Sequence, residues 1–268
     1  MQDNPTYGNY KGYYANRPFV NDPRLALLPP NFFREAVVLD IGCNEGRVTC
    51  QIAQQHGANH VVGVDIDPDL IRTAWRRRRT AWSLQEPESD FYHNDGRSFE
   101  PSQRNKHTAK GQYFPQAMEH MFGPVAIGES TPEDQTEFPH NLTFRTADWV
   151  KDGILDDEHG YDIILAFSIS KWIHLNEGDE GLKQFFKKVF KFLRPGGKFL
   201  LEPQAWENYR KAKRLDSTMK EVGSTLQIRP DDFPEMLKEI GFATYERLGT
   251  TREGGGERPV DLYTKGLT

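Results

Sequence analysis

Short apolar runs alternate with stretches of helical period along most of this chain. The apolar runs that begin at Val37, His60 and Tyr161 are typical of strands buried on both faces of a parallel sheet. Residues 45–56 have the spacing of a helix, and a second helix is predicted after Asp67, a suitable N-cap residue that is followed by proline. Because strands alternate with helices, the pattern predicts an α/β fold.

The second half of the chain continues this alternation and ends on a pair of strands. An alternating run over 141–149 predicts an edge strand, and residues 180–193 place apolar side chains at helical spacing with lysines opposite. A turn through two glycines leads into a strand that ends at Glu202, and a basic helix over 206–222, another helix and a hairpin-like strand pair follow. We therefore predict a single Rossmann-like domain over 1–268, with a mostly parallel sheet, one antiparallel C-terminal strand and helices on both faces.

Three segments do not follow the alternation. Residues 1–30 are aromatic and rich in proline, and they form either a loosely docked tail or an arm whose tyrosines, such as Tyr13 and Tyr14, close over a site. Residues 86–140 have no sustained period and are rich in Pro, Ser, Gly, Gln and His, so we expect a largely disordered insertion. Residues 170–181, SKWIHLNEGDEG, are predicted to be a loop beside the carboxyl ends of the strands.

Composition and charge exclude several classes of protein. The net charge is −5, so binding to nucleic acid would need a local basic patch rather than bulk charge. Cys43 and Cys50 lie too close together in the predicted turn and helix to build a disulfide framework, which fits a reducing compartment. The first residues lack the apolar region of a signal peptide, and no apolar run reaches the roughly eighteen residues of a membrane span. We expect an intracellular protein that is neither secreted nor inserted in a membrane.

The stretch VVLDIGCNEGRVT, residues 37–49, combines a buried strand, a glycine-bearing turn and the start of a helix. Gly42 and Gly46 permit a tight turn and let a ligand approach the backbone closely. The next strand ends in Asp65, at roughly the spacing where a carboxylate meets the hydroxyls of a ribose. The glycines alone are also compatible with a turn that binds nothing, but together with Asp65 they favour a nucleotide-like cofactor.

Two groups of basic residues have both a structural and a functional interpretation. Arg72, Arg76 and Arg79 share one face of the predicted helix, which is either solvated or in contact with a phosphate backbone. His56 and His60 are spaced like metal ligands, but the glycine between them should end the preceding helix. We therefore expect no metal site.

Several motifs in order resemble a known family. The runs VVLDIGCNEG, VVGVDID and FLRPGGKFLLEP are similar to those of class I S-adenosylmethionine-dependent methyltransferases. More narrowly, YGNY with Tyr13 and Tyr14, then LDIGCN, SKWIHLN, GDEGL and LEPQAW with Tyr209, resemble the methylphosphate capping enzymes, also called the bicoid-interacting RNA methyltransferases. The resemblance covers nearly the whole chain except the insertion and the glycine loop near Gly255. It implies S-adenosyl-L-methionine as the cofactor and methylation of the terminal 5′ phosphate of a small non-coding RNA.

The resemblance also implies roles for individual residues. Those implied to bind the cofactor are Tyr14, Arg24, Gly42, Cys43, Asn44, Asp65, Ile66, Asp148, Trp149 and Phe167. Relatives have an asparagine followed by an aromatic residue where this chain has Asp148 and Trp149. The aspartate can still accept a hydrogen bond from the adenine amine. Tyr13 and Lys171 match positions around the reacting phosphate, for which a lysine is a suitable point charge. Candidates for holding the 5′ nucleotide, each of which also suits a packing or capping role, are His174, Glu202, Gln204, Trp206 and Tyr209.

The chemistry that the resemblance implies demands little of the protein. A terminal phosphate has its second pKa near ~6, so one oxygen is already anionic at neutral pH and needs no strong general base. Catalysis then consists mainly of holding that oxygen in line with the methyl group, which recovers part of the ~7–11 kcal/mol available from orientation.

Three other functions have to be weighed. A structural RNA-binding subunit of a telomerase or small nuclear ribonucleoprotein would keep the same fold, because family members can stay bound to their RNA and work with La-related proteins. A small-molecule methyltransferase would need a closed acceptor pocket, and a nicotinamide oxidoreductase would need a fuller dinucleotide spacing than GCNEG. Relatives act on nuclear and on cytoplasmic RNAs; we expect the nucleus rather than the cytoplasm, and neither DNA nor a membrane as a partner.

Overall fold

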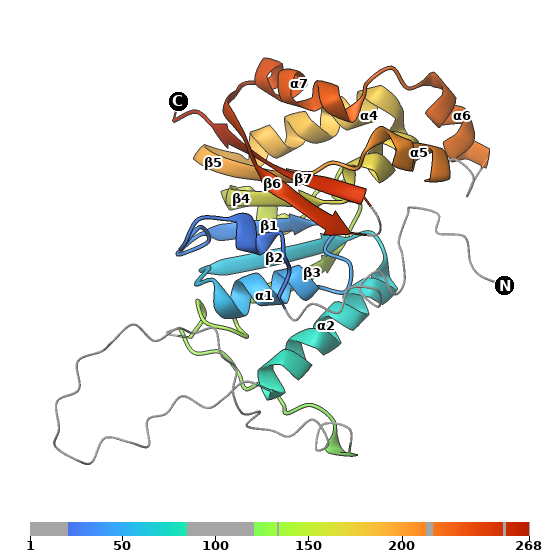
Figure 1. Ribbon diagram of the computed structural model, residues 1–268. Helices are drawn as coiled ribbons and strands as arrows, with labels where there is room; N and C mark the ends of the chain where they lie inside the picture. Colours follow the sequence, from blue (N-terminus) through green and yellow to red (C-terminus); the bar gives the residue numbers. More distant parts are fainter. Residues whose placement is uncertain (1–20, 85–120, 133, 213–216, 254–255, 268) are drawn as a thin grey trace, which may run out of the picture.

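The computed structural model describes residues 21–84, 121–132, 134–212, 217–253 and 256–267. The predictions for Tyr13, Tyr14 and most of the 86–140 insertion lie outside these residues. Within them, seven strands form one sheet in the order β3-β2-β1-β4-β5-β7-β6 (Figure 1). The strands are β1 (Val37–Ile41), β2 (His60–Asp65), β3 (Leu142–Thr146), β4 (Tyr161–Phe167), β5 (Leu193–Glu202), β6 (Phe242–Glu253) and β7 (Gly256–Lys265).

The direction of the strands confirms the predicted fold class. Strands β1 to β5 pair in parallel, with Leu39 opposite Val62 on one side and Ile164 on the other. Strand β7 is antiparallel to β5, and β6 is antiparallel to β7. The chain builds the sheet outward from β1 through β2 to β3, and then from β4 in the opposite direction. This change between β1 and β4 is a topological switch point, where ligands bind in open α/β sheets.

Helices cover both faces of the sheet, as predicted (Figure 1). One face is covered by α1 (Arg47–Gln55), α2 (Pro68–Ser83) and the short 3-10 turn η1 (Leu25–Leu27), and the other by α4 (Ser170–Phe192) and α7 (Phe233–Ile240). Each face has its own apolar core, the first around Ile52 and Val38 and the second around Phe185 and Phe199. The remaining helical elements are η2 (Leu155–His159), α5 (Trp206–Ala212), α6 (Ser217–Thr225) and η3 (Pro230–Asp232).

Local signals in the sequence set several of these boundaries. The side chain of Asp67 accepts hydrogen bonds from the backbone N–H groups of Asp69 (2.7 Å) and Leu70 (3.4 Å), so it caps α2 as predicted. Gly241 follows the last residue of α7, and its backbone N–H closes the helix onto Leu237 and Lys238. Strand β3 is an edge strand, which confirms the interpretation of its alternating pattern.

The prediction of a loop over 170–181 is wrong, because α4 already begins at Ser170. Its first turn is formed by the backbone N–H groups of Trp172 and Ile173, which both donate to Ile169 O. Trp172 and Leu175 then pack in a third apolar cluster with residues of α5 and α6, and this tertiary burial is what stabilises a polar-looking helix. The helical geometry is interrupted at Gly178, which has φ 69° and ψ −172°.

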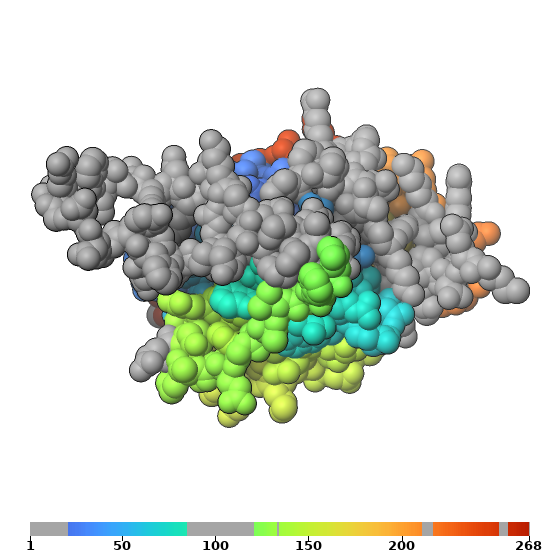
Figure 2. Space-filling model, turned by 90° about the horizontal axis from the view of Figure 1, so that it is seen from below, coloured from blue at the N-terminus to red at the C-terminus, as the bar shows by residue number. Residues whose placement is uncertain are grey.

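Two further predicted boundaries also change. The single basic helix expected over 206–222 is observed as α5 and α6, separated by residues outside the described part. Figure 2 shows the green segment after residue 120 beside α2 on one face of the molecule. There Val125 N donates to Ser83 Oγ (2.7 Å) and Arg78 Nε to Pro139 O (2.9 Å), while Phe138 is buried in the first core. The end of the predicted insertion is therefore packed against the domain. No helix in the described ranges has the length and apolar character needed to cross a membrane.

Candidate active site

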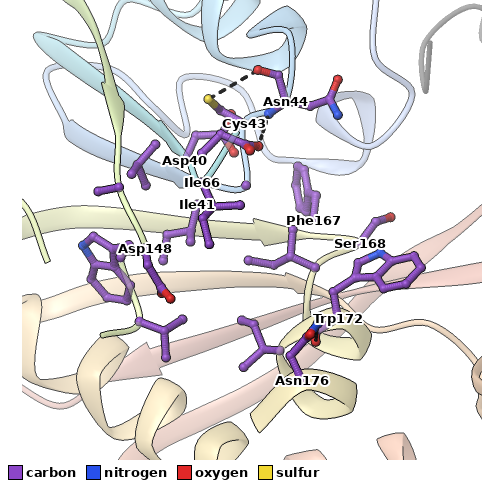
Figure 3. Close-up of a pocket in the computed structure, with 18 of the residues that line it drawn as sticks. Asp40, Ile41, Cys43, Asn44, Ile66, Asp148, Phe167, Ser168, Trp172 and Asn176 are labelled. Carbon is purple, nitrogen blue, oxygen red and sulfur yellow. Dashed lines mark hydrogen bonds between the residues drawn. The ribbon is translucent and has the colours of Figure 1, made fainter. Parts of the chain in front are cut away.

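A pocket opens at the switch point, where the carboxyl ends of β1, β2 and β4 meet (Figure 3). Its walls come from the β1–α1 loop, the end of β2, the segment after β3, the end of β4 and the first half of α4. Asp148 lies on one side of the pocket, and Phe167, Ser168 and Trp172 lie on the other (Figure 3). Every described residue that the sequence assigned to the cofactor lines it, namely Arg24, Gly42, Cys43, Asn44, Asp65, Ile66, Asp148, Trp149 and Phe167.

The β1–α1 loop is held in a conformation that only small residues allow. Gly42 has φ 72°, and a Cβ atom added there would overlap Ile169 Cγ2. The backbone N–H groups of Gly42 and Cys43 donate to Val64 O at 2.8 and 3.0 Å, which ties the loop to β2. Asn44, also at positive φ (52°), lines the pocket at the end of this turn. The result is a fixed cradle whose backbone is exposed to the pocket.

Asp65 is the carboxylate at the end of β2. Its Oδ2 accepts from Asn44 N (2.9 Å) and its Oδ1 accepts from Asp67 N (3.0 Å), so the side chain holds the loop and faces the pocket. Burial raises the pKa of Asp65, and these backbone hydrogen bonds oppose that rise. A carboxylate oxygen can accept more than one hydrogen bond, so Asp65 retains acceptor capacity for a ligand's hydroxyl groups.

Asp40, at the end of β1, is a second buried carboxyl group in the pocket wall. Thr49 Oγ1 donates to its Oδ2 at 2.7 Å. Burial is the largest effect on this group and raises its pKa to about 6, while Thr49 and the nearby Arg24 act in the opposite direction. A cationic ligand beside it would favour the ionised form.

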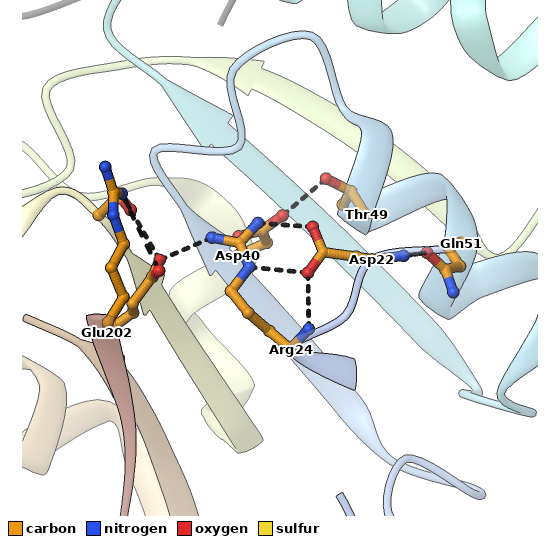
Figure 4. Close-up of polar contacts among 8 residues, drawn as sticks. Asp22, Arg24, Asp40, Thr49, Gln51 and Glu202 are labelled. Carbon is orange, nitrogen blue, oxygen red and sulfur yellow. Dashed lines mark hydrogen bonds and ion pairs between the residues drawn. The ribbon is translucent and has the colours of Figure 1, made fainter. Parts of the chain in front are cut away.

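Arg24 forms the centre of a buried ion-pair network (Figure 4). Its Nε and Nη2 donate to the two carboxylate oxygens of Asp22, both at 2.7 Å, and its Nη1 donates to Glu202 Oε2 at 2.7 Å. The guanidinium also lies 4.5 Å from the centre of the Phe167 ring. Asp22 N donates to Gln51 Oε1 (2.8 Å), which fastens this segment to α1. The network joins the segment before η1 to the ends of β4 and β5.

Ser168 links this network to the C-terminal hairpin. It directly follows β4, lines the pocket and has φ 61°, an unusual conformation for a residue other than glycine. Its hydroxyl donates to Glu202 Oε2 (2.6 Å) and accepts from Arg258 Nη1 (2.7 Å). The serine thus connects a carboxylate on β5 with a guanidinium on β7.

Lys171 lies in the first turn of α4, on the Ser168 side of the pocket. Its side chain is buried, with Nζ 4.1 Å from the centre of the Trp172 ring. Gln204 holds this turn, because its Oε1 accepts from Lys171 N (3.3 Å) and its Nε2 donates to Ser168 O. Trp172 lines the pocket, and Lys171, its neighbour in the chain, is not among the lining residues. The described structure therefore brings the predicted phosphate lysine close to the pocket wall.

The residues proposed to hold the 5′ nucleotide are mostly packed inside the protein. His174 has no exposed surface; its Nε2 lies 2.7 Å from Asp179 Oδ1 and its Nδ1 lies 3.3 Å from the Tyr209 hydroxyl. Burial lowers the pKa of His174, against the effect of Asp179, so the neutral ring donates to Asp179 and accepts from Tyr209. Trp206 is partly buried, with the Arg229 guanidinium 3.8 Å from its ring centre.

In the described conformation several of these side chains lie in the interior, and their contact with the 5′ nucleotide stays a prediction. These side chains pack in the interior or hold neighbouring backbone, which is the alternative that the sequence also allowed. The residues buried in this way are His174, Glu202, Gln204 and Tyr209.

Asp148 and Trp149 have different positions in the site. The Trp149 indole is almost wholly buried, donates to Asp157 Oδ1 (3.0 Å) and packs edge-on against Phe185, so its ring belongs mainly to the core. Asp148 remains at the pocket wall, with Lys151 Nζ 3.6 Å from its Oδ2.

Several residues of this site and its network were not singled out by the sequence for a role there, among them Asp22, Ser168, Trp172 and Arg258. Their partners are distant along the chain; Ser168, for example, meets Glu202 and Arg258. A local motif carries no information about such contacts. The positive φ of Ser168 is likewise visible only in the folded backbone.

A seven-stranded sheet with this strand order, a glycine cradle after β1 and a carboxylate after β2 together define a class I methyltransferase fold. Solved structures share it: magnesium protoporphyrin IX methyltransferase from Synechocystis PCC 6803, with bound S-adenosylmethionine, has a TM-score of 0.53 at 14% identity over 92% of this chain and 78% of that chain. The N-methyltransferase NodS from Bradyrhizobium japonicum WM9 has a TM-score of 0.52 at 12% identity, covering 97% and 94% of the two chains. At this level of identity the likeness concerns the fold.

The particular family follows from sequence comparison. A methyltransferase domain matches residues 38–115, and the Bicoid-interacting protein 3 (Bin3) family matches residues 161–265. A probable RNA methyltransferase of Arabidopsis thaliana is 34% identical, with 97% of this chain and 80% of that protein covered. The U6 snRNA methylphosphate capping enzyme Amus of Drosophila melanogaster is also 34% identical, with 97% and 74% covered. This chain belongs to the Bin3 family.

The 7SK snRNA methylphosphate capping enzyme of Mus musculus is 38% identical over 270 residues. The match includes 97% of this chain but only 40% of that protein. The chain thus spans about two fifths of the length of this relative, which has further sequence outside the match.

Proposed function

We propose that this protein is an S-adenosylmethionine-dependent methyltransferase that methylates the terminal 5′ phosphate of a small non-coding RNA. The observation that carries the proposal is the pocket at the switch point, with its glycine cradle on one wall and Lys171 packed against Trp172 of another. Relatives named as methylphosphate capping enzymes for 7SK and U6 snRNA support this choice of substrate.

The pocket residues fit the cofactor by their chemistry. Gly42 leaves room for a ligand to touch the loop backbone, and the Asp65 carboxylate can accept hydrogen bonds from a ribose. Ile66 and Asp148 would hold the adenine, and Asp40 would lie near the positively charged methionine end, together with Arg24. When bound, S-adenosylmethionine supplies a methyl group on an electron-poor sulfonium. Tyr14, outside the described residues, is proposed to close the methionine end.

The acceptor side is proposed to work by placement and charge. Tyr13 and Lys171 would hold the terminal phosphate so that one anionic oxygen faces the methyl group. Since that oxygen is already deprotonated at neutral pH, neither residue has to remove a proton. Burial of Lys171 strengthens its interaction with an anion because less water screens it. Trp206, whose side chain is partly buried, is proposed to stack on the first base.

The cellular setting belongs to the same proposal. Relatives named for small nuclear RNAs support a nuclear location, and an RNA that stays bound after methylation would place the protein in a ribonucleoprotein. A La-related protein is the proposed companion there.

The decisive experiment is methyl transfer from labelled S-adenosylmethionine to matched RNAs with 5′-triphosphate, 5′-monophosphate and 5′-hydroxyl ends. We expect label only on RNAs with a terminal phosphate, and mass spectrometry of the released 5′ nucleotide should place the methyl group on the phosphate. Transfer to the hydroxyl RNA, or methyl groups on a base or ribose, would contradict the proposal.

A second candidate function is an RNA-binding scaffold that needs no catalysis. The observation in its favour is the pair Arg76 and Arg79, which are exposed on α2 and form no ion pair within the described residues. The variant Gly42→Ala separates the two functions, because it should block the cofactor and leave α2 intact. If RNA levels and particle assembly survive this change in cells, scaffolding is the role; if they fail, methylation is required.

A further inference from the structure

The β6–β7 hairpin extends past the end of the parallel sheet. Strand β7 pairs with β5 only from Lys198 opposite Thr264 to Leu201 opposite Asp261. It stays paired with β6 as far as Gly256, so the tip of the hairpin projects beyond β5 on the side where the carboxyl ends lie. Arg258, opposite Thr251 in this overhang, is thereby brought beside Ser168, a residue that lines the pocket.

Arg258 is held there by one end of its guanidinium. Its Nη1 donates to Ser168 Oγ at 2.7 Å and lies 3.9 Å from Glu202 Oε1, too far for a hydrogen bond. The side chain is 19% exposed. A guanidinium has N–H donors at three nitrogens, and among the described residues neither Nε nor Nη2 of Arg258 makes a hydrogen bond.

The second arginine of the network differs in this respect. Arg24 uses all three of its nitrogens on the carboxylates of Asp22 and Glu202, and its side chain is 1% exposed. Each of its nitrogens thus already donates to a carboxylate of the protein. Glu202 accepts hydrogen bonds on one oxygen only within the described ranges, where its buried Oε1 has no hydrogen-bond partner. The negative charge of Glu202 therefore attracts Arg258, while Nε and Nη2 of Arg258 stay available as donors among the described residues.

We propose that Arg258 is a phosphate-binding residue of the acceptor site, which takes the terminal phosphate of the RNA through Nε and Nη2. This inference rests on the proposed function. Ser168 lines the pocket on the side away from Asp148, and its backbone is tied through Gln204 to Lys171 (Figure 3). Arg258 and Lys171 are therefore both linked to Ser168, from two different elements.

Charge and shape both suit this ligand. A terminal phosphate carries about −1.5 to −2 charges at neutral pH, which one lysine balances only in part. An arginine adds a second charge and, unlike lysine, a planar fork that matches two phosphate oxygens at once. The partial burial of Arg258 lowers the cost of displacing water when the phosphate arrives, and its bond to Ser168 fixes the fork in advance.

The test is binding of short RNAs that differ only at the 5′ end, measured with the full chain and S-adenosylhomocysteine. The wild-type protein should bind the 5′-triphosphate RNA about tenfold to a hundredfold more tightly than the 5′-hydroxyl RNA. Arg258→Met should reduce that preference to about twofold, and Arg258→Lys should restore part of it. Affinity for S-adenosylhomocysteine should stay unchanged in both, which also shows that the variants are folded.

Arg145→Met is the matched control. Arg145 pairs with Asp156 as Arg258 pairs with Glu202, but it lies on the edge strand β3, away from Ser168. Arg145→Met should prefer the 5′-triphosphate RNA over the 5′-hydroxyl RNA as strongly as the wild-type protein does.

Arg258→Met with an undiminished preference for the phosphate end would overturn the inference, and so would a wild-type protein without any such preference. Failure of the proposed function has a different signature. If the wild-type protein prefers the phosphate end and Arg258→Met loses that preference, Arg258 binds phosphate even when no methyl group is transferred.

Discussion

Glu202 illustrates how much a single side chain decides in this protein. One carboxylate, fully buried at the end of β5, receives Arg24 and Ser168 on the same oxygen and attracts Arg258 to the other. It thereby fixes three segments around the pocket. A buried charge that loses its partners is costly, so these contacts are mutually dependent.

Asp40 gives a testable dependence of cofactor binding on pH. Burial raises its pKa to about 6, so at about pH 5 roughly one molecule in ten has it ionised. If the ionised form favours the cationic methionine end, affinity for S-adenosylmethionine should fall about tenfold between pH 7 and pH 5. Titration calorimetry over this range measures it.

Asp40→Asn serves as the control for that titration, since the amide cannot ionise and its affinity should vary little with pH. The same pKa has a consequence for stability. A raised folded-state pKa gives stability that is complete below the ordinary value of 3.8 and is lost as the pH rises through about 6, so the substitution should flatten this dependence as well. An equally steep pH dependence in both proteins would rule out Asp40 as the titrating group.

Lys171→Ala tests the proposed phosphate lysine. Methyl transfer should fall by about a hundredfold or more, because a charge that stabilises the reacting group in a partly dry site is removed. Affinity for S-adenosylmethionine should remain within about twofold, since Lys171 is not among the residues that line the pocket. Lys183→Ala, an exposed lysine on the same helix, is the control and should behave like the wild type. Undiminished turnover of Lys171→Ala would remove this residue from the mechanism.

Helix α4 shows what an element adds to its residues. Its first half forms one wall of the pocket and its second half fills the core beneath β4 and β5, with Gly178 marking the change of direction between them. Asp179, directly after that glycine, accepts from His174 Nε2 and from the backbone N–H groups of Gln227 (2.8 Å) and Ile228 (3.2 Å). It ties the pocket half of α4 to the segment after α6.

Asp179→Ala should lower the free energy of unfolding by roughly 1.5–3 kcal/mol, because several charge-assisted hydrogen bonds disappear and buried His174 loses a partner. Urea denaturation measures this loss. The neighbouring substitution Glu180→Ala removes an exposed carboxylate and should change stability by less than about 0.5 kcal/mol. Equal losses of unfolding free energy in the two variants would show that the Asp179 contacts do not stabilise the fold beyond the effect of an exposed carboxylate.

The whole molecule brings both halves of the sheet to one pocket. The β1–β2–β3 half contributes the glycine cradle, Asp65 and Asp148, while the β4–β5–β7 half contributes Ser168 and the helix that carries Lys171. A ligand in this pocket therefore bridges segments that are otherwise joined along the β1–β4 pairing and through the Arg24 network. We therefore expect ligand binding to stabilise the entire domain against unfolding. The extent of that single domain over residues 1–268 stays a prediction.

S-adenosylhomocysteine at a hundredfold excess over its Kd should stabilise the protein by about 2.7 kcal/mol, or raise its Tm by roughly 5–10 °C. Gly42→Ala should show no such rise, because the added Cβ overlaps Ile169 and strains a backbone at positive φ. Gly128→Ala is the matched control: a Cβ there meets nothing within 4 Å, so the rise should be retained. A normal rise in Gly42→Ala would mean that the cofactor does not use this loop.

The sequence by itself determined the fold class, most strands, the cap of α2 and the turn that lines one wall of the pocket. These are local features: apolar runs, Asp67 before a helix, and a glycine turn whose pocket-lining residues, Gly42 to Asn44, lie on one short stretch. The helical start of α4 was missed because its apolar side becomes evident only when α5 and α6 cover it.

Only the tertiary structure decided which polar residues line the pocket and which are buried in the interior. His174 and Tyr209 have the same chemistry whether they are buried or exposed, and the sequence could not separate the two cases. Arg258 became a candidate only because an antiparallel hairpin carries it past β5 to Ser168 and Glu202. Contacts between residues so far apart in the chain depend on the path of the whole backbone, and no local pattern encodes that path.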